Sequence, residues 1–387
     1  MSLRMLRLLP VRWSVGLLAS LWCASIAWAD KLAYDSPDGR QTLDGKLVAR
    51  NSEEVLFLTP DGRMHLMNTA RVVDIEATET APKPLTQKQM EASLKSEFGG
   101  RFKVFSTQRY TICYNCSPGF ARSCGRLFEN LQKSFVNYFE QQAGFKLAPS
   151  EFPLVAVVFG DEREFLEYAA KELGDEMARN VIGYYSFLSN RMVLYDMLAA
   201  ARNKGLGNVG AARPPVGPDG IDAFNEVNIG TVIHEATHQL AYNSGLHQRF
   251  SDNPLWLAEG MAMFFEAPNR QSAQWKGIGE INRPRLDLFR ERHLVAGKPL
   301  DLESLIRNDD RLRNAETARV AYADSWALTY FLMKTRREQF FEYLSMLARK
   351  PPLGQDASDE RLADFKTAFG DDLAALEEEV VRYFRPR

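Results

Sequence analysis

Two histidines and a glutamate stand close together in the segment 231–240, TVIHEATHQL. His234 and His238 are four residues apart, which on a helix places both imidazoles on one face, about 40° apart around the axis. Such a pair can bind one divalent cation, and Glu235 would stand beside it, where a carboxylate can take a proton from metal-bound water. The apolar residues around them predict a buried helix, in which these polar groups are costly unless a partner satisfies them. The segment therefore predicts metal-assisted hydrolysis.

A third metal ligand has to come from another part of the chain. The segment 255–265, LWLAEGMAMFF, predicts an apolar helix with one acid, Glu259, at its centre. A buried, unpaired carboxylate is expensive, so we expect Glu259 to complete the site, with His247 as a competing ligand. Two imidazoles and a carboxylate suit one Zn²⁺ ion, the predicted cofactor. Glu266, on nearly the same helical face, is expected to support the ligands or to lie exposed at the helix end.

Together, the two segments resemble a known group of enzymes. H-E-x-x-H followed by W-L-A-E-G-M-A is similar to the gluzincin zinc metallopeptidases, which include thermolysin-like and aminopeptidase-N-like enzymes. The stretches HEATHQLAYNSGLH and PLWLAEGMAMFFE resemble still more an uncharacterised family of secreted bacterial proteins with a peptidase-MA-like domain. The resemblance implies a zinc metallopeptidase with metal ligands His234, His238 and Glu259 and with Glu235 as general base.

The resemblance also implies roles for two residues in the segment 321–328, AYADSWAL. Aminopeptidase-type gluzincins place a tyrosine over the developing oxyanion, about sixty residues beyond the glutamate ligand, and Tyr322 stands at that distance. A core aromatic is the alternative for Tyr322. Asp324 is expected either to orient a zinc-binding histidine through a hydrogen bond or to cap the helix.

Gluzincins bind their substrates along an edge strand that precedes the metal-binding helix. The segment 190–196 has the corresponding place, so the resemblance implies that Met192, Val193 and Leu194 form the substrate edge strand. Aminopeptidases carry there a Gly-x-Met-Glu-Asn motif that holds the substrate amino group, and this chain lacks it. We therefore expect a peptide or protein substrate and an enzyme other than an aminopeptidase.

The elements that must position these residues follow an α+β order. Short strands separated by turns predict a small SH3-like β domain at 30–78, and the proline-containing segment 79–99 predicts a linker with a lead-in helix. Strand patterns and then helical patterns predict a catalytic domain at 100–387, which the resemblance makes thermolysin/gluzincin-like, with a mixed sheet followed by a mostly helical half. A Gly/Pro-rich loop at about 203–220 is expected to be a lid or a surface excursion.

The N-terminal segment 1–29 has the features of a secretory signal peptide. Three arginines precede an apolar stretch, and Ala27-Trp28-Ala29 supplies a cleavage site, with an uncleaved membrane anchor as the alternative. We expect export to the periplasm or the extracellular space. The formal net charge of -2 excludes the basic excess typical of nucleic-acid-binding proteins.

Three cysteines follow the predicted signal peptide: Cys113, Cys116 and Cys124. An odd number in an oxidising compartment suggests one disulfide and one free thiol, and buried thiols are the alternative. The Cys113-x-x-Cys116 pattern lacks the second ligand pair that a zinc ribbon needs.

Two other functions compete with a peptidase. One is a zinc hydrolase that acts on a non-peptide amide or on cell-wall peptide. The other is an inactive zinc-bound scaffold whose residues 30–78 dock on a protein partner or on the cell envelope, although that β domain can equally be a structural appendage. The presence of Glu235 beside the two histidines favours an enzyme, because a scaffold needs no general base.

Overall fold

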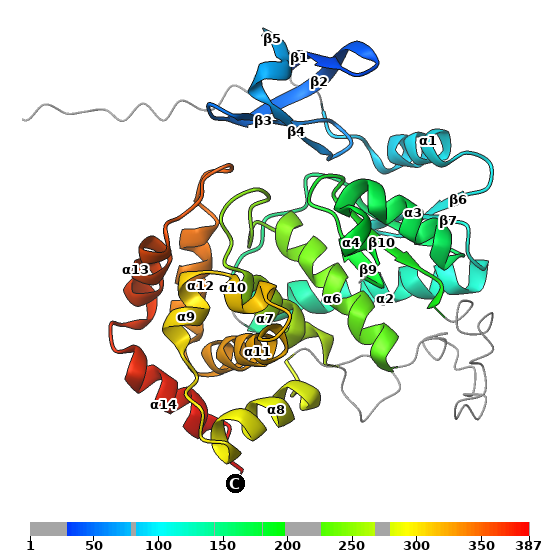
Figure 1. Ribbon diagram of the computed structural model, residues 1–387. Coiled ribbons are helices and arrows are strands. Elements are labelled where there is room, and N and C mark those ends of the chain that lie inside the picture. Colours follow the sequence, from blue (N-terminus) through cyan, green and yellow to red (C-terminus); the bar gives the residue numbers. More distant parts are fainter. Residues whose placement is uncertain are drawn as a thin grey trace, which may run out of the picture.

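The computed structural model describes residues 29–78, 83–142, 144–179, 181–197, 226–267 and 279–386. The predicted signal peptide, apart from Ala29, and the predicted loop at about 203–220 lie outside these residues. An N-terminal antiparallel sheet is followed by a mixed sheet and then by a mostly helical half, so the predicted α+β class is confirmed (Figure 1). Among the described residues, no helix combines the length and apolarity that crossing a membrane requires.

The N-terminal sheet has five antiparallel strands in the order β4-β3-β2-β1-β5. They are β1 (Ala29–Ser36), β2 (Gly39–Arg50), β3 (Glu54–Leu58), β4 (Met64–Asn68) and β5 (Val72–Thr78). Leu32, Val55, Phe57 and Met67 form a small core that is separate from the main one. The SH3-like character of this sheet stays a prediction.

One helix, α1 (Gln87–Phe98), leads from the first sheet to the second, with the bounds that the sequence predicts. Thr86 caps it in a capping box, since its side chain accepts from the backbone of Gln89 and the side chain of Gln89 accepts from the backbone of Thr86. Met90 and Leu94 anchor the helix in the main core. Glu97, in the last turn of α1, pairs with Arg63, between β3 and β4 of the first sheet, and with Arg191 of the second sheet.

The second sheet is mixed and has the order β6-β7-β8-β10-β9. Its strands are β6 (Lys103–Ser106), β7 (Tyr110–Tyr114), β8 (Leu154–Phe159), β9 (Gly183–Tyr185) and β10 (Arg191–Tyr195). β8 runs parallel to both β7 and β10, while β9 is antiparallel to β10. β8 and β10 are buried at every residue, as expected of central strands that are covered on both faces.

Helices from the first half of the chain pack against this sheet (Figure 1). They are α2 (Pro118–Val136), which continues into a π-helical turn at Asn137–Gln142, and α3 (Glu162–Leu173). The short α4 (Asp175–Ala178) packs on α3. Ser117 and Asp161 accept backbone hydrogen bonds at the starts of α2 and α3.

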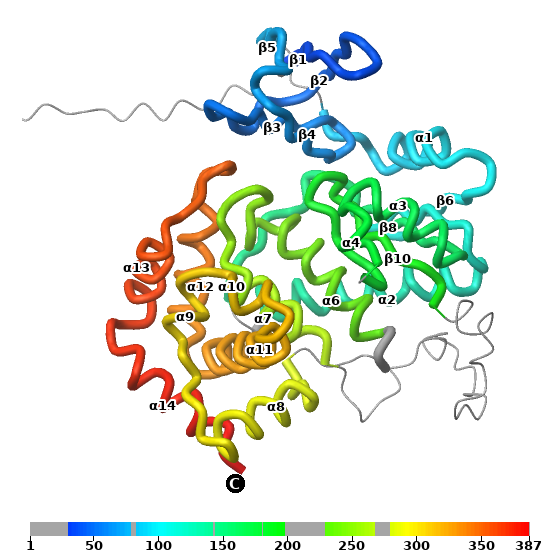
Figure 2. The backbone as a smooth tube through the Cα atoms, viewed as in Figure 1, coloured from blue at the N-terminus to red at the C-terminus, as the bar shows by residue number. Residues whose placement is uncertain are grey.

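The rest of the described chain is helical. Its helices are α6 (Glu226–Asn243), α7 (Leu255–Glu266), α8 (Arg283–Arg290), α9 (Leu302–Arg307), α10 (Asp310–Arg313), α11 (Ala318–Thr335), α12 (Arg337–Leu347), α13 (Ser358–Phe369) and α14 (Leu373–Tyr383). α7 lies between α6 and α11, although α11 follows it by more than fifty residues (Figure 2). Trp256 of α7 and Trp326 of α11 are fully buried.

The crossing of α7 and α11 depends on a glycine. A Cβ atom at Gly260 would lie 2.1 Å from Oγ1 of Thr329 and 2.7 Å from the carbonyl oxygen of Ser325. Both distances are too short for any side chain, so only glycine lets the two helices approach this closely. The crossing fixes the distance between Glu259, at the centre of α7, and the first turns of α11.

All three described cysteines are free and buried, so the predicted disulfide is wrong and the alternative of buried thiols holds. Cys113 lies on β7, and Cys116 and Cys124 lie in the following turn and in α2. Burial raises the pKa of the Cys113 and Cys116 thiols to about 12, which keeps both in the protonated, unreactive form at neutral pH.

Candidate metal centre

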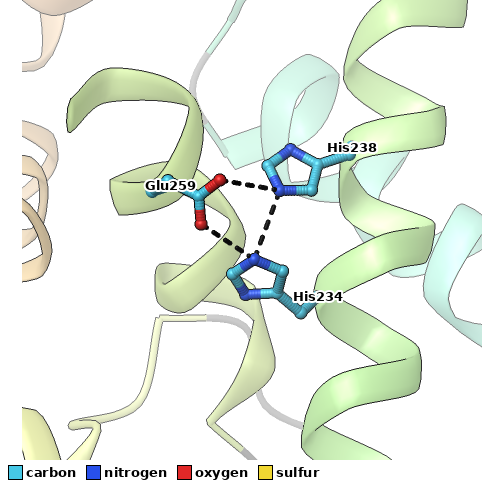
Figure 3. A group of neighbouring side chains, drawn as sticks. All are labelled: His234, His238 and Glu259. Atoms are coloured by element: carbon cyan, nitrogen blue, oxygen red, sulfur yellow. Dashed lines mark hydrogen bonds and ion pairs between the residues drawn. The ribbon is translucent and has the colours of Figure 1, made fainter. Parts of the chain in front are cut away.

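Two neighbouring helices bring the three predicted metal ligands together (Figure 3). His234 and His238 project from α6, and Glu259 projects from the middle of α7. Nε2 of His234 lies 3.2 Å from Nε2 of His238 and 3.1 Å from Oε2 of Glu259, and Nε2 of His238 lies 3.6 Å from Oε1 of Glu259. Among the described residues, this group is the one whose ligand atoms could surround a metal ion.

The spacing of these atoms fits zinc. Two ligand atoms that are each about 2.0–2.1 Å from a tetrahedral zinc ion lie about 3.3 Å from one another. The three observed separations, 3.1, 3.2 and 3.6 Å, lie around this value. Two imidazoles and a carboxylate are ligand types that zinc accepts, and three protein ligands leave a fourth position for water, as in catalytic zinc sites.

Glu266 determines which nitrogen of His234 carries the hydrogen. Its Oε2 lies 2.9 Å from Nδ1 of His234, and a carboxylate can only accept, so Nδ1 donates. The neutral ring of His234 then turns the lone pair of Nε2 toward the carboxylate of Glu259. Electron-rich atoms that face one another at this distance require a cation between them, which is a proton or a metal ion. Asn282 holds Glu266 in turn, with its Nδ2 donating to Oε1 at 2.6 Å.

The two histidines differ in their affinity for a proton when no metal is bound. Burial opposes protonation of His234, but the carboxylates of Glu259 and Glu266 outweigh it and raise the pKa of His234 well above its ordinary value. Burial lowers the pKa of His238 to about 4. The metal-free site therefore holds a proton on His234 at neutral pH, and this proton has to leave when a metal ion binds.

Glu235 lies next to the metal group and is held by the second sheet. Its Oε2 accepts a hydrogen bond of 3.0 Å from the backbone N–H of Tyr185, in β9. Burial raises the pKa of Glu235 to about 7, although nearby His234 acts in the opposite direction. A carboxyl group with a pKa near neutrality can take up and release a proton at physiological pH, as a general base must.

A cavity of about 520 Å³ opens onto these residues and has two unlike walls. One wall is aromatic, with the rings of Tyr185 and Phe187 packed on that of Tyr242 at centroid distances of 5.7 and 4.8 Å. Another part of the lining is polar and includes Asp252, Asp309 and Arg313. The metal group also lines the cavity. The aromatic wall lies next to it, because Tyr242 comes from α6, the helix that carries His234 and His238, and Tyr185 comes from the neighbouring β9.

Tyr322 lines the same cavity from α11. The guanidinium of Arg285 lies over its ring, 5.5 Å from the centroid. Burial raises the pKa of Tyr322 above its ordinary value, and the negative charges of Glu259 and Glu235 add to the effect. The hydroxyl therefore keeps its proton at neutral pH and can donate a hydrogen bond in the cavity.

Asp324 serves a different group from the one predicted. Its Oδ1 lies 2.8 Å from Nε2 of His293, and its Oδ2 accepts from Arg311; within the described residues it has no bond to either histidine ligand. It also lies inside α11 rather than at its cap. Two residues turn a helix by about 200°, so Asp324 points away from the face that carries Tyr322. Both predicted roles of Asp324 are therefore wrong.

The predicted substrate strand lies inside the sheet. Met192, Val193 and Leu194 belong to β10, which pairs with β8 on one side and with β9 on the other, so their backbone is not free to pair with a substrate. The sheet ends at β9 within the described residues. The hairpin of β9 and β10 is recognisable in the sequence, but the sequence does not say which of its two strands joins β8.

His247 lies outside the metal group. It is 2% exposed, and its ring packs on Tyr242 at a centroid distance of 5.2 Å. Burial lowers the pKa of His247 to about 3, so the ring is neutral at physiological pH. The competing ligand that the sequence leaves open is thus excluded.

Three contributors to the site escape prediction from the sequence. Tyr185 contacts Glu235 through its backbone N–H, so the type of its side chain gives no sign of this contact in the sequence. Asn282 is recognisable as the N-cap of α8, but capping says nothing of its bond to Glu266. Arg285 reaches Tyr322 only because α8 packs on α11.

Residues 228–354 match a protein family described as "Protein of unknown function (DUF1570)". The matched segment contains His234, Glu235, His238, Glu259 and Tyr322, and it ends before α13. No curated protein matches the chain. The similarity therefore covers both helices of the metal centre and leaves out both sheets.

Proposed function

We propose that this chain is an exported zinc-dependent hydrolase that cleaves amide bonds in peptides or proteins. The observation that carries the proposal is the convergence of His234, His238 and Glu259 within reach of one ion, with Glu235 beside them on a cavity. Membership of the gluzincin metallopeptidases, a thermolysin-like catalytic fold and export through the signal peptide are parts of the same proposal.

Each residue has a defined task in this hydrolysis. Zinc bound by His234, His238 and Glu259 would acidify its water and polarise the scissile carbonyl. Glu235 removes the proton from the attacking water and delivers it to the leaving amine. Tyr322 donates its hydroxyl hydrogen to the oxyanion that forms in the cavity.

Further residues of the chain support these tasks. Glu266 keeps Nδ1 of His234 protonated, so that Nε2 is available as a metal ligand. The amide of Tyr185 orients the carboxylate of Glu235. Glu266 and Tyr185 belong to a helix and a strand that are packed in the fold, α7 and β9. They therefore hold His234 and Glu235 in place before the reaction, which lowers the entropy cost of aligning these side chains.

The surroundings favour an extended peptide as substrate. β9 is the edge of the sheet within the described residues, and an extended peptide can add to such an edge through backbone hydrogen bonds. Phe187, which is 44% exposed, offers an apolar side chain to the substrate at the cavity. The chain lacks the aminopeptidase motif for a free amino group, which favours cleavage within a peptide.

Replacement of the general base tests the proposal. Glu235→Gln should retain one zinc ion per chain, because Glu235 is not a ligand, and should lose hydrolysis of casein or of a peptide library by about 10²–10⁴-fold. Wild-type protein should lose activity with a chelator and regain it with zinc. Glu303→Gln is the control, since Glu303 pairs with Arg307 on the surface. A Glu235→Gln variant that cleaves as fast as the wild type would show that the base is wrongly assigned.

A further inference from the structure

The N-terminal sheet contacts the rest of the chain through residues 59–64, which comprise the turn between β3 and β4 and the first residue of β4 and which we call the docking turn. The backbone N–H of Met64 donates to the carbonyl oxygen of Leu188 at 2.7 Å. Leu188 lies between β9 and β10, in residues 186–190, which we call the wall turn because it carries Phe187 into the cavity wall. The first sheet is therefore hydrogen-bonded to the part of the second sheet that borders the cavity.

Arg249 joins the two turns a second time. It is 6% exposed, and its Nη1 donates to the carbonyl oxygens of Gly62 in the docking turn and Phe187 in the wall turn, both at 3.0 Å. A buried guanidinium is costly unless hydrogen bonds compensate for its lost hydration. Because one of its two acceptors belongs to each turn, Arg249 is satisfied only when the two turns lie together.

An ion-pair group closes the same interface from the side. Glu97, at the end of α1, accepts from Arg191 of β10 at 2.7 and 2.8 Å and also pairs with Arg63 of the docking turn. Arg191 is 2% exposed, so its charge depends on Glu97 for compensation. The group ties the docking turn to the strand that follows the wall turn.

Contacts lead from the docking turn to the proposed general base. A Cβ atom at Gly62 would lie 3.0 Å from the ring of Phe152, closer than an ordinary contact, and 3.4 Å from Nδ2 of Asn190, so the docking turn lies next to Asn190. Oδ1 of Asn190 accepts from the hydroxyl of Tyr185 at 2.7 Å. The backbone N–H of Tyr185 holds Glu235.

The metal-binding helix contacts the same asparagine. Asn243, in the last turn of α6, exchanges hydrogen bonds of 2.8 and 3.0 Å with the side chain of Asn190. Gln239 of α6 donates to the carbonyl oxygen of Asn190 at 3.1 Å. Asn190 has φ of 57°, in the left-handed region, so its backbone needs this support. The wall turn is thus held between the docking turn and α6.

We propose that the N-terminal sheet is a positioning part of the site: the docking turn fixes the wall turn, and through it the Tyr185 amide against Glu235 and Phe187 in the cavity wall. Gly62, Arg249 and Glu97 are positioning residues in this scheme. It gives residues 30–78 a role within the chain, where the sequence suggested an appendage or a module for an external partner. The inference goes beyond the proposed hydrolysis, and its first test needs no substrate.

Two glycine variants of the full-length, zinc-loaded protein test the inference. Gly62, in the docking turn, and Gly39, at the start of β2, have positive φ, 83° and 101°, so alanine strains the backbone at both. A Cβ at Gly62 would press on Phe152 and contact Asn190, whereas at Gly39 it would meet no described residue within 4 Å. Gly39→Ala is therefore a matched control for strain within the sheet.

Amide hydrogen exchange is the first measurement. Gly62→Ala should speed exchange over residues 183–190 about three- to tenfold and leave α13 unchanged, because it frees the wall turn without unfolding the helical half. Gly39→Ala should leave residues 183–190 as in the wild type. Arg249→Met, which fills much of the same space but has no donor for the two carbonyl oxygens, should act like Gly62→Ala. Equal exchange over residues 183–190 in the wild type and in both Gly62→Ala and Arg249→Met overturns the inference.

Activity provides the second measurement. Gly62→Ala should lower kcat about three- to tenfold with unchanged zinc affinity, because the ligands on α6 and α7 stay in place while the proposed base loses its alignment. Loss of zinc together with activity would instead indicate general destabilisation and would contradict a positioning role. If the wild type does not hydrolyse amides, the proposed function fails, while the exchange measurement still decides the inference.

Discussion

Nδ1 of His234 lies 2.9 Å from Oε2 of Glu266, while Nε2 of the same ring lies 3.1 Å from Oε2 of Glu259. Both acids come from α7, seven residues apart, which returns a helix to nearly the same face after two turns. One helix thus supplies a predicted metal ligand and the group that orients another ligand. Four predictions follow from this centre and its surroundings.

Removal of the charge on Glu266 should weaken metal binding. Glu266→Gln keeps an oxygen that can accept from Nδ1 of His234 but loses the negative charge that makes the ring a better donor to the metal. We expect zinc affinity to fall about 10–100-fold. Competition with a chromophoric chelator measures it, with Glu303→Gln as the surface control. Equal affinities would mean that the contact with His234 does not tune the metal.

Alanine at Gly260 should destabilise the protein, because its Cβ would overlap with Thr329 and Ser325 of α11. We expect a loss of about 1–3 kcal/mol or more in the free energy of unfolding. Gly230→Ala is the matched control: Gly230 also lies in a helix, and a Cβ there would meet no described residue within 4 Å. The control should gain about 0.5–1 kcal/mol. Urea unfolding of both variants measures the difference, and similar values for the two would contradict the close crossing.

Neutralising Asp324 should cost stability but not metal. Asp324→Asn leaves the guanidinium of Arg311 without its buried counter-charge and removes the carboxylate that lies against Nε2 of His293. We expect the free energy of unfolding to fall by about 3–5 kcal/mol. Zinc affinity, measured on the folded variant, should equal that of the wild type, since Asp324 does not contact the ligands in the described structure. Asp310→Asn, at an exposed position of α10, is the control. A large change in zinc affinity would revive the role first predicted for Asp324.

His247 should make the protein less stable in acid. Burial lowers its pKa to about 3, below the ordinary value of 6.5 in the unfolded chain. As the pH falls below about 6.5, the unfolded chain therefore binds a proton at His247 while the folded chain does not. The free energy of unfolding is unaffected by His247 above that pH and falls between pH 6.5 and pH 3, by up to about 1.4 kcal/mol per pH unit.

The comparison of His247→Gln with the wild type isolates this effect. Urea unfolding of both proteins without metal at pH 7, 6 and 5 should show that the wild type loses more stability on acidification, since all other titrating groups are shared. Parallel pH dependences in the two proteins would show that His247 is not the group responsible.

The sequence predicts the elements that carry the ligands better than the contacts around them. The four-residue spacing of His234 and His238 and the lone acid in an apolar helix are local patterns, and local patterns follow from helical geometry. The start of α1 is equally local, since Thr86 and Gln89 form its capping box.

Long-range pairing limits what the sequence can show. Which strand of the 183–195 hairpin joins β8 depends on the parallel pairing of β10 with β8, whose partners are more than thirty residues apart. The role of Asp324 depends on which helices face α11, and its partners His293 and Arg311 come from separate segments. The contact between the docking turn and the wall turn joins residues more than a hundred positions apart and leaves no periodic signal.

The ligands lie on two helices, so a bound ion would tie positions 238 and 259 together much as a disulfide ties two cysteines. The unfolded chain lacks this arrangement, and an ion at a thousand times its dissociation constant would add about 4 kcal/mol to the free energy of unfolding. A chain without its ion would therefore open more often and be degraded faster by proteases. Its lifetime would then follow the local supply of zinc.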